Sequence, residues 1–310
     1  MTDTLAGTMA RFRDGSLAKH SFIEAMHSLH ARLFEYPALL HGGEILGIEI
    51  AAGGVVFITK AGIRFRLDPA DQRQPPLEVL NFGPFEKEDG EMLAGLIAPG
   101  AVVYDVGANI GWYSLHLAAA DPSVRVFAFE PVPSTLSRLR DNLALNGLPN
   151  ITLIDHGLSD RDEELTFYVY PEGSGGSSAA NMSGRPSVHE VRCVVKRLDD
   201  VYTTLSAGPD VMKVDVEGAE LFVLRGAVEC LNRHRPVVFC EMLRKWAAKF
   251  NYHPNDIIDL LRSLGYTCFI ARPGRHLVAC PQVTEATAET NFFFLHNDRH
   301  AALVAQYARD

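Results

Sequence analysis

The stretch VYDVGANIGW, residues 103–112, decides the fold of this 310-residue chain. It predicts a buried strand that ends at Asp105, followed by a turn that leads into a helix near Trp112. Gly107 and Gly111 would let the backbone of this turn approach a ligand, because no Cβ stands in the way. Such turns are typical of nucleotide-binding α/β domains, although the GxGxxG spacing of a dinucleotide site is absent from this stretch.

The charge at this turn indicates which ligand it can take. Asp105 would repel a pyrophosphate and attract an ammonium group. S-adenosylmethionine carries an ammonium and a sulfonium and has no phosphate, so charge favours it over a dinucleotide. The next strand ends in FAFEP, residues 127–131, where Glu130 can accept both hydroxyls of a ribose and Pro131 fixes the turn that follows.

Short apolar runs alternate with helical stretches on both sides of these motifs. This alternation predicts the α/β class, with a parallel sheet and right-handed crossovers. Final runs at 266–270 and 291–295 close the domain, which we place at residues 95–310. The remaining expected strands are residues 101–106, 124–129, 151–154, 211–216 and 236–240, with helices over 134–146 and 219–232.

Residues 1–94 have a different pattern and form an N-terminal accessory region. Apolar residues at helical spacing predict one amphipathic helix over 17–40 that ends near Pro37. Runs at 45–50, 55–59 and 63–67, separated by glycine turns, predict a small antiparallel meander. The amphipathic helix is also a candidate surface for a homo-oligomer.

Composition limits the class of protein. A hydrophobic content of 47% and a charged content of 22% are ordinary for a globular chain. The net charge of −9 makes nucleic acid a poor partner. Five widely spaced cysteines fit a reducing compartment, and the sequence has neither a signal core nor an apolar run of membrane-spanning length. We therefore expect a soluble, cytoplasmic protein.

Four motifs occur in chain order: DVGANIG at 105–111, FEP at 129–131, LSD at 158–160 and KVDVEGAE at 213–220. Together they resemble the FkbM-type S-adenosylmethionine-dependent methyltransferases, over about residues 85–295. The resemblance implies a Rossmann-like, seven-stranded, mostly parallel sheet whose last strand is antiparallel. It also implies O-methylation of a hydroxyl on a sugar, a glycan or a natural product, and hence a small-molecule or saccharide acceptor.

The resemblance assigns roles to the residues that match these motifs. Asp105, Gly107 and Asn109 would line the methionine half of the donor, and Glu130 would bind its ribose. Ser159 and Asp160, which follow the third strand, are the candidates for contact with adenine. Glu86, just before the domain, is a candidate for contact with the donor's amino group; the alternative is that it belongs to a solvated run of charges. The full set of expected donor-binding residues is Glu86, Asp105, Gly107, Asn109, Glu130, Pro131, Ser159 and Asp160.

Three acids follow later strands at the same edge of the expected sheet. Asp215 and Glu217 end the fourth strand, and Glu241 ends the fifth. Together they could hold Mg²⁺, or one could act as the base for an alcohol. Asp215 and Glu217 could also stabilise the N-terminus of the helix that follows, and the two interpretations are compatible.

A glycine- and serine-rich segment, PEGSGGSSAANMSG at 171–184, joins two expected strands at 165–170 and 188–195. The segment would emerge at the ligand-bearing edge, so we expect a lid over the acceptor. Asn181 and His189 are the candidate contacts to the acceptor, with a solvent-facing position as the alternative for each.

Two other functions stay open. A nucleic-acid methyltransferase would use the same catalyst, but enzymes that methylate bases carry an Asn or Asp-Pro-Pro-aromatic run after the fourth strand, where this chain has DVEG at 215–218. A non-catalytic, S-adenosylmethionine-binding assembly module would use the N-terminal helix for subunit contacts.

Overall fold

A central sheet of eight strands organises the computed structural model, which describes residues 4–181 and 188–309. In spatial order the strands are β13 (His276–Ala279), β12 (Tyr266–Arg272), β14 (Asn291–His296), β11 (Val237–Glu241), β10 (Val211–Val214), β4 (Val102–Val106), β5 (Arg125–Phe129) and β6 (Ile151–Ile154). The five strands from β11 to β6 pair in parallel, which confirms the predicted α/β class.

The sheet has one strand more than the seven that the resemblance implies. β14 runs antiparallel between β11 and β12, as expected for the last strand. The eighth strand is β13, which folds back on β12 as a hairpin with Arg272 opposite His276. The edge of the sheet is therefore extended, and the arrangement of the other seven strands is unaffected.

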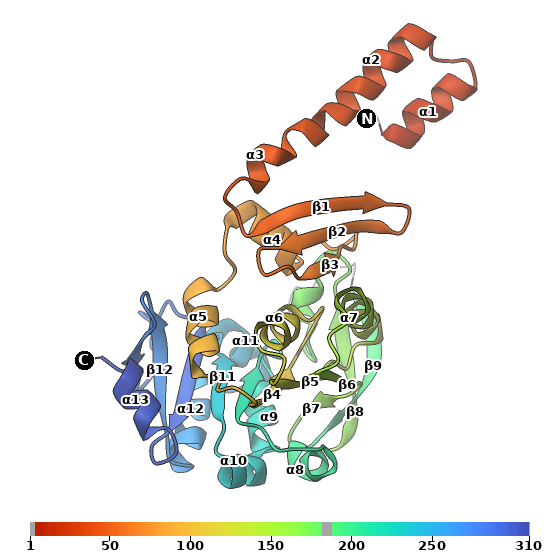
Figure 1. The fold of residues 1–310 in the computed structure, drawn as a ribbon. Coiled ribbons are helices and arrows are strands. Elements are labelled where there is room, and N and C mark those ends of the chain that lie inside the picture. The colour runs from red at the N-terminus through yellow and green to blue at the C-terminus, as the bar shows by residue number, and fades with distance from the viewer. Residues whose placement is uncertain (1–3, 182–187, 310) are drawn as a thin grey trace.

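Helices cover both faces of this sheet (Figure 1). Residues of β4 alternate between the two cores: Tyr104 packs on one face and Val103 on the other. Because neighbouring strands in register present their side chains to the same face, this alternation also fixes where the polar residues of the strands point. The helices are α5 (Lys87–Leu96), α6 (Trp112–Ala120), α7 (Pro133–Asn146), α8 (Leu198–Val201), α9 (Glu220–Arg225), α10 (Val228–His234), α11 (Arg244–Ala247), α12 (Pro254–Ser263) and α13 (Ala301–Tyr307).

Helix α5 crosses the domain boundary that we expected between residues 94 and 95. Met92, Leu93 and Leu96 are buried in the same core cluster as Phe269 and Phe293 of the central sheet. Structurally, α5 packs as part of the larger domain.

The predicted N-terminal meander is confirmed, with β1 (Ile45–Ala51), β2 (Gly54–Thr59) and β3 (Arg64–Arg66) in antiparallel order, followed by α4 (Pro75–Phe82). Phe65 of β3 is fully buried and stacks on Trp112 at 5.2 Å between ring centroids. Two asparagines of α7 satisfy the free edge of β3. Asn142 accepts a hydrogen bond from Arg66 N at 2.9 Å, and Asn146 bonds both the N–H and the C=O of Arg64.

The single helix predicted over residues 17–40 is wrong. The segment instead forms α2 (Lys19–His30), a 3₁₀ turn η1 (Ala31–Phe34) and α3 (Tyr36–Leu40). Pro37 lies in the first turn of α3 rather than ending a helix, because a proline in a first turn lacks only an N–H that would be unpaired there. A further helix, α1 (Leu5–Arg13), was not foreseen, and its Phe12 stacks on Phe22 of α2 at 4.2 Å.

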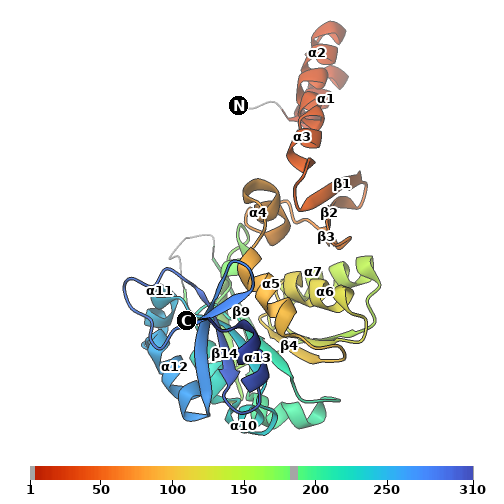
Figure 2. The ribbon, with the colours of Figure 1, turned by 60° about the vertical axis from the view of Figure 1, so that its left-hand side comes forward.

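These N-terminal helices form an arm that extends away from the central sheet (Figures 1 and 2). Among the described residues, no helix combines the length and the apolar character needed to cross a bilayer. Joining of two copies through this arm stays a prediction. Most of the exposed large apolar side chains lie on it: Leu5, Met9, Phe12, Ile23, Leu33, Phe34, Tyr36 and Leu39.

A second small sheet is inserted after β6. Its strands are β7 (Gly157–Leu158), β8 (Glu163–Val169) and β9 (His189–Lys196), with β9 in the middle. The two strands expected on either side of the glycine-rich segment are thus confirmed as β8 and β9. Between them the described part of the segment contains a 3₁₀ turn, η2 (Ser174–Gly176), while residues 182–184 lie outside the described residues.

The asparagine contacts of α7 predict how the meander is attached. Asn142 is fully buried and also donates to Ile110 O at 2.9 Å. Asn142→Ala would leave the Arg66 N–H and the Ile110 C=O without this partner, so we expect the free energy of unfolding to fall by about 1–3 kcal/mol. Chemical denaturation measures this change. The matched control is Asp141→Ala at the neighbouring exposed position, and equal stability of the two variants would contradict this account.

Candidate active site

Two adjoining pockets open at the carboxyl ends of the parallel strands, where open α/β sheets collect their ligands. Counting the open solvent at their mouths, the first encloses about 780 Å³ of space between atoms and the second about 1580 Å³. Five residues line both pockets and therefore form their common wall. These residues are Gly107, Asn109, Gly175, Asp215 and Glu217.

The turn after β4 brings its backbone against the end of β10. Gly107 has a φ of 80°, and a Cβ built on it would stand 1.8 Å from the carbonyl oxygen of Asp215. Only glycine fits so close an approach. Asn109 is also left-handed, with a φ of 51°, which Asn tolerates better than most residues. Its Oδ1 is buried without a hydrogen-bond partner among the described residues.

Glu130, directly after β5, ties this turn to the next one. It is 6% exposed, and its two carboxyl oxygens accept hydrogen bonds from Val132 N at 2.9 Å and Asn109 N at 3.0 Å. Burial raises the pKa of Glu130 to about 7, although the two backbone hydrogen bonds oppose this shift. A carboxylate has about four lone-pair positions, so Glu130 can still accept two hydroxyl groups.

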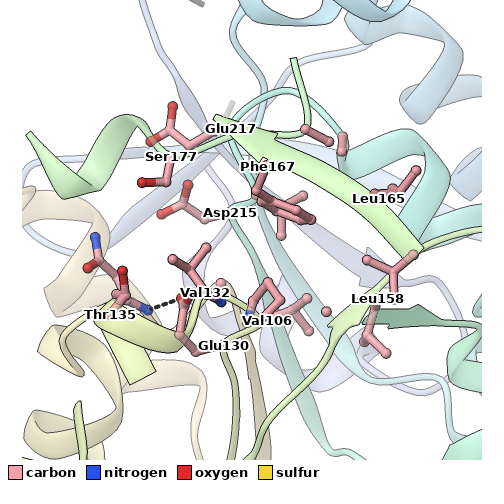
Figure 3. A pocket seen from close by; sticks show the side chains of 18 of the residues that line it. Val106, Glu130, Val132, Thr135, Leu158, Leu165, Phe167, Ser177, Asp215 and Glu217 are labelled. Carbon is pink, nitrogen blue, oxygen red and sulfur yellow. Dashed lines mark hydrogen bonds between the residues drawn. The ribbon is translucent and has the colours of Figure 1, made fainter. Parts of the chain in front are cut away.

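The first pocket combines Glu130 with an apolar wall. Figure 3 shows Glu130 and Asp215 on one side and Leu158, Leu165 and Phe167 facing them. The inserted sheet supplies much of this wall, through Leu158 of β7 and Leu165 and Phe167 of β8. An apolar wall opposite a carboxylate with free lone pairs is a combination that suits an adenosine group.

Of the two residues expected to contact adenine, Ser159 lies at a pocket and Asp160 does not. Ser159 lines the first pocket, as do Pro131 and Ser177, whose Oγ is also buried without a partner among the described residues. Asp160 is not among the residues that line either pocket, and its carboxylate lies 3.3 Å from Arg161 Nε.

Asp105 does not line either pocket. It shares a face of the sheet with Val103, so its side chain points toward α6, where it accepts a hydrogen bond from Ser114 Oγ at 2.6 Å. It is fully buried, and Lys213 Nζ lies 3.3 Å from its Oδ1. The ammonium group that we expected Asp105 to attract is thus provided within the chain.

Lys213 is a functional candidate that the sequence analysis missed. It lines the second pocket, yet it is 4% exposed in the middle of the sheet. Its Nζ lies 3.2 Å from Asp215 Oδ2, 3.4 Å from the Gly107 carbonyl oxygen and 5.2 Å from the centre of the Tyr113 ring. Burial acts to lower the pKa of Lys213, but the Asp215 and Asp105 carboxylates outweigh it and raise the pKa above its usual value. A lysine between apolar residues of a central strand is the signal that could have found it.

Asp215, Glu217 and Glu241 come together, with one ligand atom of each within 4.8 Å of the others. Burial, with the nearby Asp215 charge, raises the pKa of both Glu217 and Glu241 well above the usual value. Glu217 itself has a left-handed φ of 55°, a strained conformation of the kind that concentrates at functional sites.

A fourth acid, Glu220, supports the turn that carries this group. Its Oε1 accepts hydrogen bonds from Val216 N at 3.1 Å and Gly218 N at 2.9 Å, and Tyr252 donates to its Oε2 at 3.0 Å. Glu220 therefore satisfies the backbone at the start of α9, and the carboxyl groups of Asp215 and Glu217 face the pockets.

Glu86 lies in the wall of the second pocket, immediately before α5. Its carboxyl oxygens accept hydrogen bonds from the Tyr113 hydroxyl and from Asn291 Nδ2, the latter at 2.9 Å. Burial raises the pKa of Glu86, and these two hydrogen bonds oppose the shift. Glu86 is thus fixed by two partners rather than forming part of a solvated charge run.

The second pocket is rich in aromatic rings and carboxylates. Its aromatic lining residues are Phe85, Trp112, Tyr113, Tyr170 and Trp246. Acids outnumber bases along its wall: Glu78, Glu86, Glu172, Asp215, Glu217 and Glu241 stand against Arg73, Lys213 and Lys245.

The described part of the glycine-rich segment covers both pockets. Gly175 lines both, and the Ser178 hydroxyl donates to the Glu217 carbonyl oxygen at 2.8 Å. Asn181 and His189 are not brought to either pocket. Both are exposed, and Asn181 accepts a hydrogen bond from the Tyr170 hydroxyl at 3.0 Å.

Known proteins with similar sequences cover parts of this chain. AMB antimetabolite synthetase AmbE of Pseudomonas aeruginosa is 31% identical over 231 residues, which are 58% of this chain and 11% of that protein. Hexuronic acid methyltransferase AglP of Haloferax volcanii is 32% identical, over 42% of this chain and 52% of that protein. The 31-O-demethyl-FK506 methyltransferase FkbM of Streptomyces tacrolimicus is 31% identical, over 42% and 60%.

The chain thus spans about a tenth of AmbE and between half and three fifths of the other two proteins. A family model, the methyltransferase FkbM domain, matches residues 105–268, from the end of β4 into β12. This range is just over half of the chain and contains the glycine turn, Glu130 and the carboxylate group at Asp215. The chain belongs to the FkbM methyltransferase family.

Proposed function

We propose that this chain is an S-adenosylmethionine-dependent O-methyltransferase. The observation that carries the proposal is the pair of adjoining pockets whose common wall includes Asp215 and Glu217. A methyl donor in the first pocket and an alcohol in the second would meet at these carboxylates. Two reactants held together in this way gain about 7–11 kcal/mol relative to free encounter.

The residues of the first pocket fit the donor. Glu130 has lone pairs for two ribose hydroxyls, and the buried Asn109 Oδ1 and Ser177 Oγ need partners that a ligand would supply. The apolar wall suits adenine. When bound, S-adenosylmethionine supplies an electrophilic methyl group and leaves as a neutral thioether.

A carboxylate at the common wall, or Glu241 beside it in the second pocket, would take the proton from the acceptor hydroxyl. We favour Glu217 and Glu241 for this role, because burial raises the pKa of each and so makes it a stronger base. Mg²⁺ is the alternative, since the spacing of the three carboxylates suits a cation. However, the Lys213 ammonium lies 3.2 Å from Asp215 Oδ2 and would repel a dication there.

The acceptor that best suits the second pocket is a hydroxylated small molecule, such as a sugar or a natural product. Aromatic rings pack on apolar faces, and carboxylates accept hydrogen bonds from hydroxyl groups. The names of AglP and FkbM give acceptors of these kinds for those proteins. The excess of acids along the pocket wall does not favour nucleic acid, whose phosphates need basic partners.

Donor binding depends on Glu130 in this proposal. Glu130→Gln is expected to weaken S-adenosylmethionine binding at least tenfold, about 1.4 kcal/mol, measured by calorimetry. Because Glu130 has a pKa of about 7, its ionised form increases between pH 6 and 8, so the affinity of the unaltered protein should rise over this range. The variant should lose that rise. Glu164→Gln, at an exposed position on β8, is the control, and equal affinities of the two variants would refute the donor site.

Turnover depends on Glu217 and Glu241. Each Glu→Gln variant should lower kcat at least 100-fold, because the proton acceptor is lost. Glu241→Gln should also change donor affinity less than threefold, because Glu241 lines only the second pocket, whereas Glu217 lines both. The assay follows labelled methyl from S-adenosylmethionine into a panel of hexosides and alcohols, with Glu88→Gln, at an exposed position on α5, as the control. Activity that a chelator abolishes and Mg²⁺ restores would replace the base with a metal site.

A further inference from the structure

The central strand β10 carries a lysine, Lys213, whose charged side chain is buried. Lys213 is 4% exposed, and its neighbours Met212 and Val214 are fully buried. Moving an ammonium group out of water costs several kcal/mol unless partners compensate for it. The proposed mechanism does not use this lysine.

The partners of Lys213 come from two neighbouring strand ends: Asp105 and Gly107 belong to β4 and the turn after it, and Asp215 follows β10. Asp105 pairs with Lys213 directly in the parallel register of β4 and β10, which places both side chains on one face. Asp215 directly follows β10, the strand that carries Lys213, and its side chain is 35% exposed in the wall of the two pockets. The Gly107 carbonyl oxygen, 3.4 Å from Nζ, belongs to the turn that lies between them.

The balance of charge explains why this lysine cannot be lost alone. One ammonium lies within 3.3 Å of two carboxylates, so the group has a net charge of −1. Without Lys213, the carboxylates of Asp105 and Asp215 would lose the ammonium that they share, beside a turn in which Gly107 leaves no room for a Cβ next to the Asp215 carbonyl oxygen. Like charges repel each other more strongly in a partly buried setting than in water.

We propose that Lys213 is the positioning residue of the active site, holding Asp105 and the glycine turn on the donor side and Asp215 at the common wall in one fixed arrangement. Asp105 then acts through Lys213 and Ser114 rather than by touching the donor. The identity of the donor in this inference rests on the proposed function. The role of Lys213 does not depend on which acceptor is methylated.

The charge of Lys213 gives this role a signature that simple packing lacks. S-adenosylmethionine carries a sulfonium charge, and S-adenosylhomocysteine does not. Lys213 contacts Gly107 and Asp215, which line both pockets. Removing its positive charge should therefore favour binding of the cationic S-adenosylmethionine over S-adenosylhomocysteine. Removing the negative charge of Asp105 should shift the preference toward S-adenosylhomocysteine. Removing both charges should leave the preference of the unaltered protein.

The experiment measures both ligands by calorimetry on the full chain, for Lys213→Met, Asp105→Asn and the double variant. Lys213→Met should weaken S-adenosylhomocysteine binding at least tenfold. It should also raise the ratio of the S-adenosylhomocysteine Kd to the S-adenosylmethionine Kd at least threefold. Asp105→Asn should lower that ratio, and the double variant should return it to within twofold of the unaltered protein. Lys60→Met, an exposed lysine of the N-terminal region, is the control.

Each result decides the proposal. A ratio that is the same in all variants, or S-adenosylhomocysteine binding by Lys213→Met within threefold of the unaltered protein, overturns it. Thermal unfolding checks that each variant is folded. If Lys213→Met does not fold, the lowered ratio in Asp105→Asn and its return in the double variant decide the question. Failure of the unaltered protein to bind either ligand would contradict the proposed function instead.

Discussion

The contact between the Gly107 backbone and the Asp215 carbonyl group is the constraint on which the rest of the site depends. A Cβ at residue 107 would stand 1.8 Å from that carbonyl oxygen, so the turn after β4 and the end of β10 can meet only through a glycine. This contact makes one wall common to the two pockets. It also brings the Gly107 carbonyl to Lys213, whose ammonium joins Asp105 to Asp215.

Both additions to the central domain support this same region. The N-terminal meander places Phe65 on Trp112, the first residue of the helix after the glycine turn. The inserted sheet contributes Leu165 and Phe167 to the first pocket, and its loop binds the Glu217 carbonyl through Ser178. The additions therefore shape the pockets, while the parallel strands position the polar groups.

The sequence predicted the parts of the molecule that repeat a regular pattern. Apolar runs gave the parallel strands, and the acids that follow them gave Glu130, Asp215, Glu217 and Glu241 at one edge. It could not tell which acids face a ligand. That depends on register, which turns Asp105 toward α6, and on local hydrogen bonds, which make Glu220 the acid that supports the start of α9.

Other features of the structure could not be predicted from a sequence pattern alone. Lys213 was visible as a charge in an apolar strand, but its partners Asp105 and Gly107 lie on β4 and the turn after it and become its neighbours only in the folded sheet. The glycine-rich segment has no periodicity, so nothing in it could show that Asn181 would remain exposed. Helix α1 was missed because its residues are mostly polar or small, and it packs on α2 through pairs such as Phe12 and Phe22.

A crystal structure of the protein with S-adenosylhomocysteine tests the central claim most directly. The account predicts the adenine against Leu158 and Phe167, and the ribose hydroxyls within hydrogen-bond distance of the Glu130 carboxylate. The sulfur should face the common wall at Asp215 and Glu217, with the second pocket left for the acceptor. Density for the ligand outside the first pocket, or a ribose without contact to Glu130, would contradict the account.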